Sequence, residues 1–594
     1  MGFHSLAIGT SALLTARYGL DVTGQNLGNV DTAGYSRQRV NQEATLGWNS
    51  GLSNAVIGTG VWTSSVKRIG SEYVEKQLRQ ATTTDEYYGS LQNTYSHLQS
   101  YVNELSGNAL SDSMTNFWSA MTDFSTQVEN IAIRRTTVTQ AEQMTGRFNA
   151  LGEQLAGYRK DLDTEVKDSV TQINRILGGI AELNKQIVHT ELGGASNISA
   201  NDLRDQRGEL AKELYKYMDA DIVEEDNGSY IVSIHGRSLV YFDQAKEVVN
   251  QKTLSKDGTM VNMPVFAKDK YPLSPANGLL AAQMEARDSI IPSYQDELNN
   301  LAANFIWEFN RAYSQSRGLE SFTSLTSLNG PTNPEATLDQ LKYADNVPAG
   351  TFEIKNGVFQ IIVHNRNSDQ PTTVPIEVDL DGRPSPLGEP DMILYDPSNP
   401  DASHSLINRM QKALDEAAPG VFEVSIDRHN QVSITSKSDD YGFCFGEDTS
   451  GVLAALGMNV FFTGHDATSM GVNQSLKANP ELIAGATSFS KGDNNGALNL
   501  LKVREKELST LKSSTLEGYY QGMTGRLGSE ASSAKNMKNL SCDVLNRMFV
   551  QRESLSGVNE DEEVSKLITY QRAFQSAAKF ISTVDQLYET LINM

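Results

Sequence analysis

Proline is missing from both ends of this 594-residue chain. All 16 prolines lie between Pro264 and Pro480, so the first 263 and the last 114 residues contain none. A proline inside a helix costs about 3 kcal/mol, and long helices therefore avoid it. The two proline-free flanks predict helical arms that enclose a middle of different structure.

Cysteine and basic residues are also scarce. Cys444 and Cys542 are the only cysteines, which argues against a disulfide framework or a zinc site. The chain has 50 Lys and Arg residues but 73 Asp and Glu residues, and the resulting net charge of -23 repels nucleic acids and anionic membranes. No stretch approaches the ~18 consecutive apolar residues of a membrane helix. We expect a protein with no nucleic-acid or membrane partner and, because the first basic residue is Arg17, no cleaved secretory leader.

Signatures of catalysis are missing as well. The eight histidines are scattered, and no P-loop, dinucleotide fingerprint or Gly-x-Ser-x-Gly sequence occurs. Residues 379–382, Asp-Leu-Asp-Gly, resemble the start of a calcium loop but lack its later glutamate, which favours a plain turn. We predict no catalytic, cofactor-binding or metal-binding residue and no enzymatic activity.

Heptad repeats of apolar residues occupy both ends. The N-terminal stripe is Leu6, Leu13, Leu20 and Leu27, with Ala16, Thr23 and Val30 between them. The C-terminal stripe is Leu567, Phe574, Ile581 and Tyr588, supported by Val564, Ile568, Ala577, Val584, Leu587 and Leu591. This spacing is typical of coiled coils. Each stripe could dock on the chain's own body, but terminal segments are usually poorly ordered unless they are tied down. We therefore expect the stripes to be buried in neighbouring subunits.

Between the ends, a helical stripe runs from Met144 to Ile187, and residues 497–555 predict helices that return antiparallel. Asn227-Gly228 and Asn356-Gly357 each predict a β-hairpin, and period-two alternation continues to Ile434 with one helix near 405–417. The predicted fold is α+β, elongated and multi-domain. The predicted parts are a coiled-coil domain from 1–40 and 556–594, a helical body from 41–320 and 480–555 with a small hairpin subdomain near 221–265, and an inserted β-rich outer domain at 340–465.

Four separated motifs carry a resemblance that spans the chain. Residues 26–38, Asn-Leu-Gly-Asn-Val-Asp-Thr-Ala-Gly-Tyr-Ser-Arg-Gln, resemble the N-terminal signature shared by flagellar rod, hook and hook-associated proteins. Residues 556–563 and 570–574 are similar to the C-terminal motif of the hook-associated members, and 201–207 and 457–464 to their internal landmarks. Ala33 departs from the proline common in the family, and the two cysteines are unusual for it.

The resemblance implies a structural, non-enzymatic subunit of the bacterial flagellum, secreted by type III export to the extracellular junction between hook and filament. It implies an inner coiled-coil layer made by the termini, a helical middle layer and a β-rich outer layer. The implied partners are identical subunits, the hook protein, hook-associated protein 3, a flagellar export chaperone and the type III export apparatus.

Individual residues can be weighed within this frame. Asn26 to Arg37 should end the first helix in a defined turn, with Gly34 giving a permissive backbone. Tyr35 and Arg37 are residue types favoured at interfaces. Asn559 and Glu562 have capping-box spacing, and the adjacent acids suit the helix dipole. The predicted assembly interface comprises Leu6, Leu13, Leu20, Leu27, Asn26, Asn29, Thr32, Gly34, Tyr35, Ser36, Arg37, Leu567, Tyr570, Phe574, Ile581, Leu587, Tyr588 and Leu591.

Two other classes of function are open to a chain of this kind. One is a secreted hydrolase or adhesin whose β-rich domain binds glycan, for which a convergent pair of carboxylates would be the mark. The other is a cytosolic coiled-coil scaffold, which would stay inside the cell whether or not export is blocked.

Overall fold

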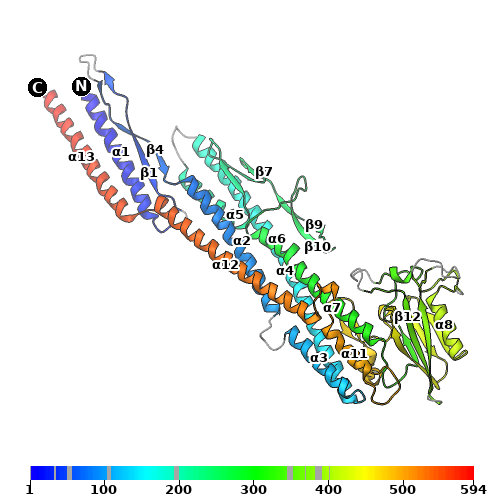
Figure 1. Ribbon diagram of the computed structural model, residues 1–594. Coiled ribbons are helices and arrows are strands. Elements are labelled where there is room, and N and C mark those ends of the chain that lie inside the picture. Colours follow the sequence, from blue (N-terminus) through cyan, green and yellow to red (C-terminus); the bar gives the residue numbers. More distant parts are fainter. Residues whose placement is uncertain are drawn as a thin grey trace. The chain divides into compact units, whose positions relative to one another are not determined.

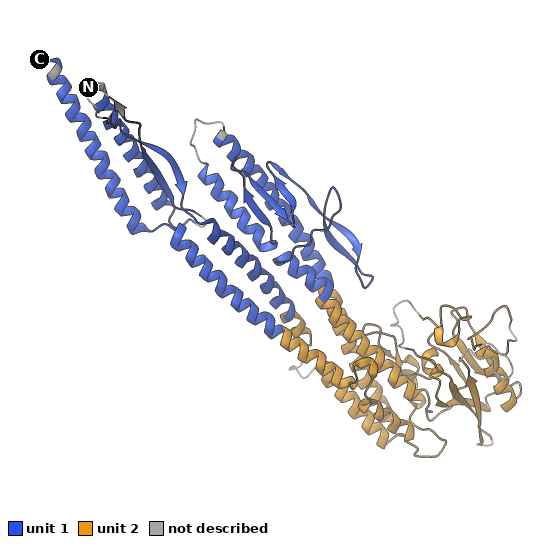
Figure 2. Cartoon of the chain, turned by 45° about the horizontal axis from the view of Figure 1, so that its top comes forward, with its two compact units in different colours: residues 1–95, 160–289, 531–594 blue, residues 96–159, 290–530 orange. Residues whose placement is uncertain are grey.

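The computed structural model describes residues 2–32, 35–49, 56–102, 109–192, 200–343, 352–367, 370–380, 391–399 and 402–593. The chain divides into two compact units, which Figure 2 colours separately. Unit 1 comprises residues 1–95, 160–289 and 531–594, and unit 2 comprises 96–159 and 290–530. Three long helices contribute residues to both: α2 (Glu72–Val102), α4 (Ile131–Leu192) and α12 (Leu516–Ser556).

Unit 1 contains the chain termini and two groups of strands (Figure 1). Its further helices are α1 (Gly2–Gly28), α5 (Asn201–Tyr217), α6 (Leu279–Glu285) and α13 (Glu560–Ile592). Its strands are β1 (Gln38–Ala44), β2 (Trp48–Asn49), β3 (Val56–Ile57), β4 (Val61–Arg68), β5 (Asp221–Glu224), β6 (Tyr230–Ile234), β7 (Arg237–Tyr241), β8 (Gln244–Ala245), β9 (Val248–Leu254) and β10 (Met260–Phe266). β1 and β4 form one antiparallel pair, and β5 to β8 form a meander in sequence order.

The core of unit 1 forms where α4 meets α5 and the β5–β8 sheet. The predicted stripe supplies Val166, Ile173 and Ile180, which are fully buried in the same cluster as Leu214 and Val232. The Asn227-Gly228 hairpin lies where it was predicted, between β5 and β6. The returning helix α12 runs antiparallel to α2, because Ser541 bonds Asp85 while Arg552 pairs with Glu75.

Unit 2 combines helices with a β-rich part. Its further helices are α3 (Leu110–Thr126), α7 (Ile291–Tyr313), α8 (Leu406–Ala417), α9 (Val452–Leu456), α10 (Gln474–Ala478) and α11 (Asn495–Glu505). Its strands are β11 (Ser324–Thr326), β12 (Gly357–Asn365), β13 (Gln370–Val378), β14 (Phe422–Ile426), β15 (Val432–Ser436), β16 (Tyr441–Asp448), β17 (Phe462–Thr463) and β18 (Gly471–Val472). The orders β13-β12-β16 and β11-β15-β14 make two three-stranded antiparallel sheets.

Aromatic side chains build the helical core of unit 2. The core contains Phe117 of α3, Phe305 and Phe309 of α7, and Phe461 and Phe462. Neighbouring rings of this group have centroids 4.9–6.3 Å apart. The sequence motif at 457–464 therefore packs the end of the β-rich part onto α3 and α7. Helix α8 confirms the predicted helix near 405–417.

One predicted hairpin is wrong. Asn356-Gly357 does not join two strands: residues 353–355 are not a strand, and Gly357 begins β12, where it pairs with Val378 of β13. The Asn356 side chain instead accepts a hydrogen bond from the Leu380 amide, 2.5 Å away. An Asn-Gly pair is equally suited to a strand entrance, which period-two alternation does not distinguish from a turn.

The chain is thus an α+β protein, as predicted. None of its described helices is both long and apolar enough to cross a bilayer. Within the described ranges, no group of three or more His, Cys, Asp or Glu side chains is placed to hold a metal ion. Asp381 and Gly382 of the predicted 379–382 turn lie outside those ranges.

Candidate assembly site at the chain termini

The two terminal helices pack against each other along their length (Figure 1). Gly9 of α1 lies against Ile581 of α13, Gly19 lies against Tyr570, and Asn26 bonds Glu563. Residue numbers rise along one helix as they fall along the other, so the pair is antiparallel. The N- and C-terminal sequences, more than 500 residues apart, therefore form one structure.

The packed face of α13 follows the predicted heptad. The residues spaced by three and four along this face are all buried or half-buried, while most residues between them are exposed: Leu567, Tyr570, Phe574, Ala577, Ile581, Val584 and Tyr588. This face meets α1 of the same chain. From its sequence, this stripe was expected to be buried only in neighbouring subunits. That expectation is wrong for α13, because helix α1 of the same chain covers the stripe.

The packed face of α1 agrees with the predicted one only in part, at Ala16 and Thr23. Leu6, Leu13, Leu20 and Leu27 are only half-buried, and the buried positions are small or polar: Gly9, Ala16, Gly19, Thr23 and Asn26. A Cβ added at Gly19 would lie 2.5 Å from the Tyr570 ring, and one at Gly9 would lie 2.7 Å from Ile581. Small residues bring the helix axes close enough for the large side chains of α13 to lie against the α1 backbone. The leucines flank this seam and keep apolar surface open to solvent.

Asn26 connects four parts of the chain. Its side-chain oxygen accepts hydrogen bonds from the Gln38 amide (2.9 Å) and the Tyr35 hydroxyl (2.7 Å). Its Nδ2 donates to the Gln38 carbonyl and to Glu563 Oε2, both at 2.9 Å. All of its polar atoms are used, and only 1% of the residue is exposed. Asn26 thus fixes the end of α1, the signature turn, the start of β1 and the start of α13 in one place.

Glu563 and Arg37 complete a network that we term the terminal clasp: Asn26, Arg37, Glu562, Glu563 and Lys566. Arg37 Nε donates to Glu563 Oε1 (2.8 Å) and Nη2 to Glu562 (2.6 Å), while Lys566 donates to Glu563 Oε1 (2.9 Å). The Arg37 amide also donates to the Ser556 carbonyl. Burial alone would raise the pKa of Glu563, but bonds from Asn26 and Lys566 and the charges of Lys566 and Arg37 lower it below its ordinary value. The buried carboxylate is therefore ionised and fully paired.

The rest of the signature surrounds the clasp. Tyr35 is partly buried close to Asp205, Asp202 and Glu563, and burial followed by these charges raises the pKa of its phenol to about 12. Thr32 donates to the Asn29 side chain, and Asn29 donates to the Gln25 carbonyl, so both residues close the end of α1. Ser36 is half-buried, and Gly34 lies outside the described residues. Tyr35 and Arg37, predicted to contact another subunit, both bond within their own chain.

The capping prediction at the start of α13 is confirmed in part. Asn559 accepts a hydrogen bond from the Glu562 amide, as an N-cap should. Glu563, however, does more than complement the helix dipole: it is 1% exposed and forms the centre of the clasp. A signal for this was present, because Glu563 lies seven residues before Tyr570 and therefore shares the packed face of α13.

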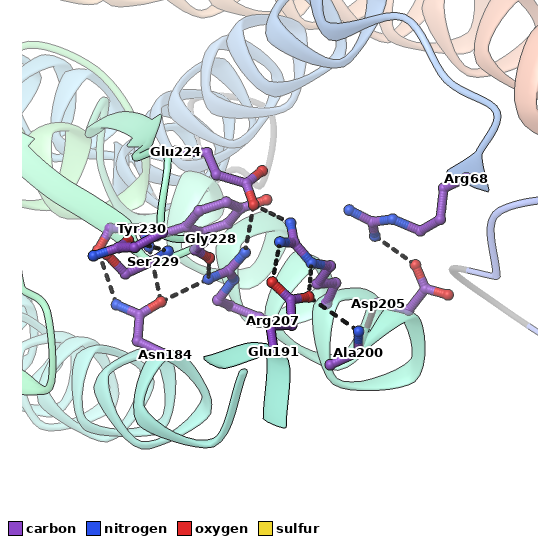
Figure 3. Close-up of polar contacts among 12 residues, drawn as sticks. Arg68, Asn184, Glu191, Ala200, Asp205, Arg207, Glu224, Gly228, Ser229 and Tyr230 are labelled. Carbon is purple, nitrogen blue, oxygen red and sulfur yellow. Dashed lines mark hydrogen bonds and ion pairs between the residues drawn. The ribbon is translucent and has the colours of Figure 1, made fainter. Parts of the chain in front are cut away.

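The internal motif at 201–207 joins α5 to the signature and to the hairpin (Figure 3). Arg68 of β4 pairs with Asp205 at 2.7 Å. Arg207 is fully buried over the Tyr230 ring at 3.5 Å and donates to Asn184 (2.8 Å) and to the Gly228 carbonyl (2.6 Å). The motif is therefore structural: it anchors the β1–β4 pair and the β5–β6 hairpin to one helix.

Apolar side chains outside the packed seam remain exposed on α13. Leu587 is 62% exposed, and Val564, Ile568 and Phe580 are also exposed. Of the predicted interface residues on α13 whose side chains the structure describes, Leu587 is the exposed one. Leu591 lies in α13, but its side chain is outside the described part of the structure.

Comparisons with known proteins find similarity to flagellar proteins. The family profile described as the flagellar hook-associated protein FlgK helical domain matches residues 95–323, and the flagellar basal body rod FlgEFG protein C-terminal profile matches 551–594. Flagellar hook-associated protein 1 of Bacillus subtilis strain 168 is 24% identical over 100% of this chain and 98% of that protein. The protein of the same name from Salmonella typhimurium strain LT2 is 23% identical over 98% of both chains.

A solved structure is also similar. The flagellar hook junction protein FlgK from Burkholderia pseudomallei matches 81% of this chain and 100% of its own, with 14% identity and a TM-score of 0.48. The sequence matches extend over the whole chain and include both terminal motifs. The chain is therefore similar over its whole length to flagellar hook-associated proteins.

Proposed function

We propose that this protein is a structural, non-enzymatic subunit of the junction between flagellar hook and filament and that it polymerises through its terminal helices. The proposed partners are identical subunits, the hook protein and hook-associated protein 3. The proposed route is secretion by the type III export apparatus with an export chaperone, to an extracellular position on the flagellum. Support comes from the family and from the surface of unit 1.

The distribution of exposed apolar side chains is the observation that supports polymerisation most directly. Among the described residues, every exposed large hydrophobic side chain belongs to unit 1 except Leu319, Leu328, Val358 and Leu498. Many lie on the terminal helices and the end of α12: Leu14, Tyr18, Leu540, Val544, Phe549, Val550, Leu555, Val564, Ile568, Phe580, Leu587 and Ile592. Exposed apolar surface concentrated on one part of a protein marks an interaction site.

The proposal also assigns a role to each part of the chain. Residues 1–40 and 556–594 would form the assembly domain, 41–320 and 480–555 the helical body, and 340–465 the outer β-rich domain. The predicted interface residues divide accordingly. Residues of the clasp and the α1–α13 seam would shape the assembly domain, while Leu587 and the half-buried leucines of α1 would contact neighbours.

Substitutions on the exposed face of α13 test the proposal. Replacing Phe580 and Leu587 by Asp would place two charges in the proposed contact. Both side chains are largely exposed, although part of the Phe580 ring also lies near Gly9 of α1. We expect cells that produce this variant to carry hooks without filaments and to release the filament protein into the medium, whereas purified chain keeps its helix content and melting temperature.

The matched control replaces Ser582 and Gln586 by Asp, because both lie on exposed positions of the same helix. This control adds the same charge and should still allow filaments to grow. Normal filaments on cells with the Phe580 and Leu587 variant would refute assembly through this face. Leu567 and Phe574 are less suitable targets, since they pack against α1 and their loss would disturb the subunit itself.

A further inference from the structure

One polar pair interrupts the small and apolar seam between α1 and α13. Glu563 occupies the same heptad position as Tyr570, Ala577 and Val584, which follow at intervals of seven. Asn26 occupies the same heptad position as Gly19. Thr23 also lies in this seam, but its hydroxyl donates to the Gly19 carbonyl of its own helix.

Within the apolar seam itself, the remaining contacts do not define how far the helices slide along each other. Outside the seam, the Arg37–Glu562 pair and the hydrogen bond from the Arg37 amide to Ser556 add to the preference for the observed register. If α13 moved by one heptad, Gly19 would face Ala577 instead of Tyr570, and a small residue would still face an apolar one. Repeating apolar patterns commonly allow several registers, and a single buried polar residue in such a seam selects one of them. The shift would place Asn26 against Tyr570 and would leave the Glu563 carboxylate without its Asn26 partner.

We infer that the buried Asn26–Glu563 hydrogen bond is the determinant of register and direction in the terminal helix pair. Burying a carboxylate without its partners costs much free energy. Every register that separates Glu563 from Asn26 is therefore less stable than the observed one. Asn26 and Glu563 are therefore positioning residues. Arg37, in the signature turn, adds to the preference for this register because it donates a hydrogen bond to Glu563.

The register reaches beyond the two helices. Asn26 exchanges two hydrogen bonds with the Gln38 backbone, and Gln38 pairs with Arg68 at the end of the β1–β4 ladder. Arg68 in turn is paired with Asp205 of α5. These contacts hold Asn26 in place relative to the rest of unit 1, so the Asn26–Glu563 bond sets the position of α13 relative to that unit as well.

Cross-linking of the full-length chain tests the inference. Cys444 and Cys542 are first replaced by Ala and Ser. Ala12→Cys with Ala577→Cys reports the observed register, because 12 and 577 match the spacing of the Gly9–Ile581 and Gly19–Tyr570 contacts. Ala12→Cys with Val584→Cys reports a shift of one heptad. With Asn26 and Glu563 intact, only the first pair should cross-link.

In the Asn26→Leu, Glu563→Leu background, the yield of the shifted pair should rise about tenfold over its yield in the parent chain, since the buried selective contact is gone while the apolar seam remains. Arg37 keeps Glu562 as a partner in that variant. Glu563→Gln, which preserves the hydrogen bond to Asn26, should retain the single register. Circular dichroism should show unchanged helix content in all variants.

Three results would overturn the inference: cross-linking of both pairs in the parent chain, cross-linking of the first pair alone in the leucine variant, or loss of helix in that variant. The last would make the polar pair a requirement for folding rather than for register. The inference deepens the proposed function but is measured on soluble chain. Failure of the proposed function would appear separately, as filaments that grow on cells producing the Phe580 and Leu587 variant.

Discussion

Gly19 and Gly24 stand little more than one turn apart in α1 and have opposite surroundings. A methyl group at Gly19 would lie 2.5 Å from the Tyr570 ring, whereas one at Gly24 would meet nothing within 4 Å. Alanine is favoured over glycine in a helix by about 1 kcal/mol. We predict that Gly24→Ala stabilises the terminal pair by up to about 1 kcal/mol and that Gly19→Ala destabilises it by about 1–3 kcal/mol, through overpacking. Amide exchange along α13 measures both, and equal effects would contradict the close contact.

Glu563 should make the terminal pair sensitive to acid. Its pKa is lowered in the folded state, so its contribution is present above the ordinary glutamate pKa of about 4.3 and is lost as the pH falls through the lowered value. We predict that Glu563→Gln destabilises the pair by about 2 kcal/mol at pH 7, as expected for charged hydrogen bonds. The difference from the parent chain should shrink toward zero below pH 4 when amide exchange in α13 is compared. A difference that stays constant with pH would contradict an ionised Glu563.

Elements differ in how strongly they depend on one side chain. Arg207 of α5 is fully buried and holds the β5–β6 hairpin through Gly228 and Asn184, whereas Arg175 of α4 pairs with Glu213 in solvent. We predict that Arg207→Met costs about 2–4 kcal/mol, because it leaves the buried Gly228 carbonyl unpaired. Arg175→Met should cost less than about 1 kcal/mol. Chemical denaturation of the two variants measures the difference, and similar losses would contradict an anchoring role for Arg207.

Helices were predicted from sequence better than their contacts. The stripe of α4 and the heptad of α13 consist of large apolar residues, and periodicity alone indicates which face is packed. The seam of α1 was predicted only in part, at Ala16 and Thr23. Leu6, Leu13, Leu20 and Leu27 dominate its hydrophobic pattern, although Gly9 and Gly19 permit the closest approach. A hydrophobic pattern ranks residues by their side chains. It therefore does not reveal that a glycine, which has none, lets a second helix come close.

Polar contacts between distant segments were beyond prediction for a different reason. The partners of Glu563 are Asn26 and Arg37, more than 500 positions away, and no local spacing relates them. The signature and the C-terminal motif each indicated a functional role, but only the folded chain shows that the two motifs bond each other. Asn356-Gly357 illustrates the converse, because a strong local hairpin signal is overridden by the pairing of β12 with β13.

At the scale of the whole molecule, the β-rich part of unit 2 has little apolar surface to offer a neighbour. Val358 is the one exposed large hydrophobic side chain among the described residues of 330–455. The two ends of this segment meet, since the Asn329 amide donates to the Leu456 carbonyl at 3.0 Å. Most of its core lies within the segment, including Phe359, Leu406 and Phe445, and Trp307 and Phe322 outside it complete that core.

We predict that replacing residues 330–455 by a two-residue glycine linker leaves filament growth intact. The linker is long enough because residues 329 and 456 are already hydrogen-bonded, and the aromatic core formed by Phe117, Phe309 and Phe461 is retained. The shortened chain should melt with one transition fewer than the parent and should still restore filaments to cells that lack the protein. The Phe580→Asp, Leu587→Asp variant in the same cells provides the contrast. A shortened chain that keeps its helices by circular dichroism but gives hooks without filaments would show that assembly also depends on the outer domain.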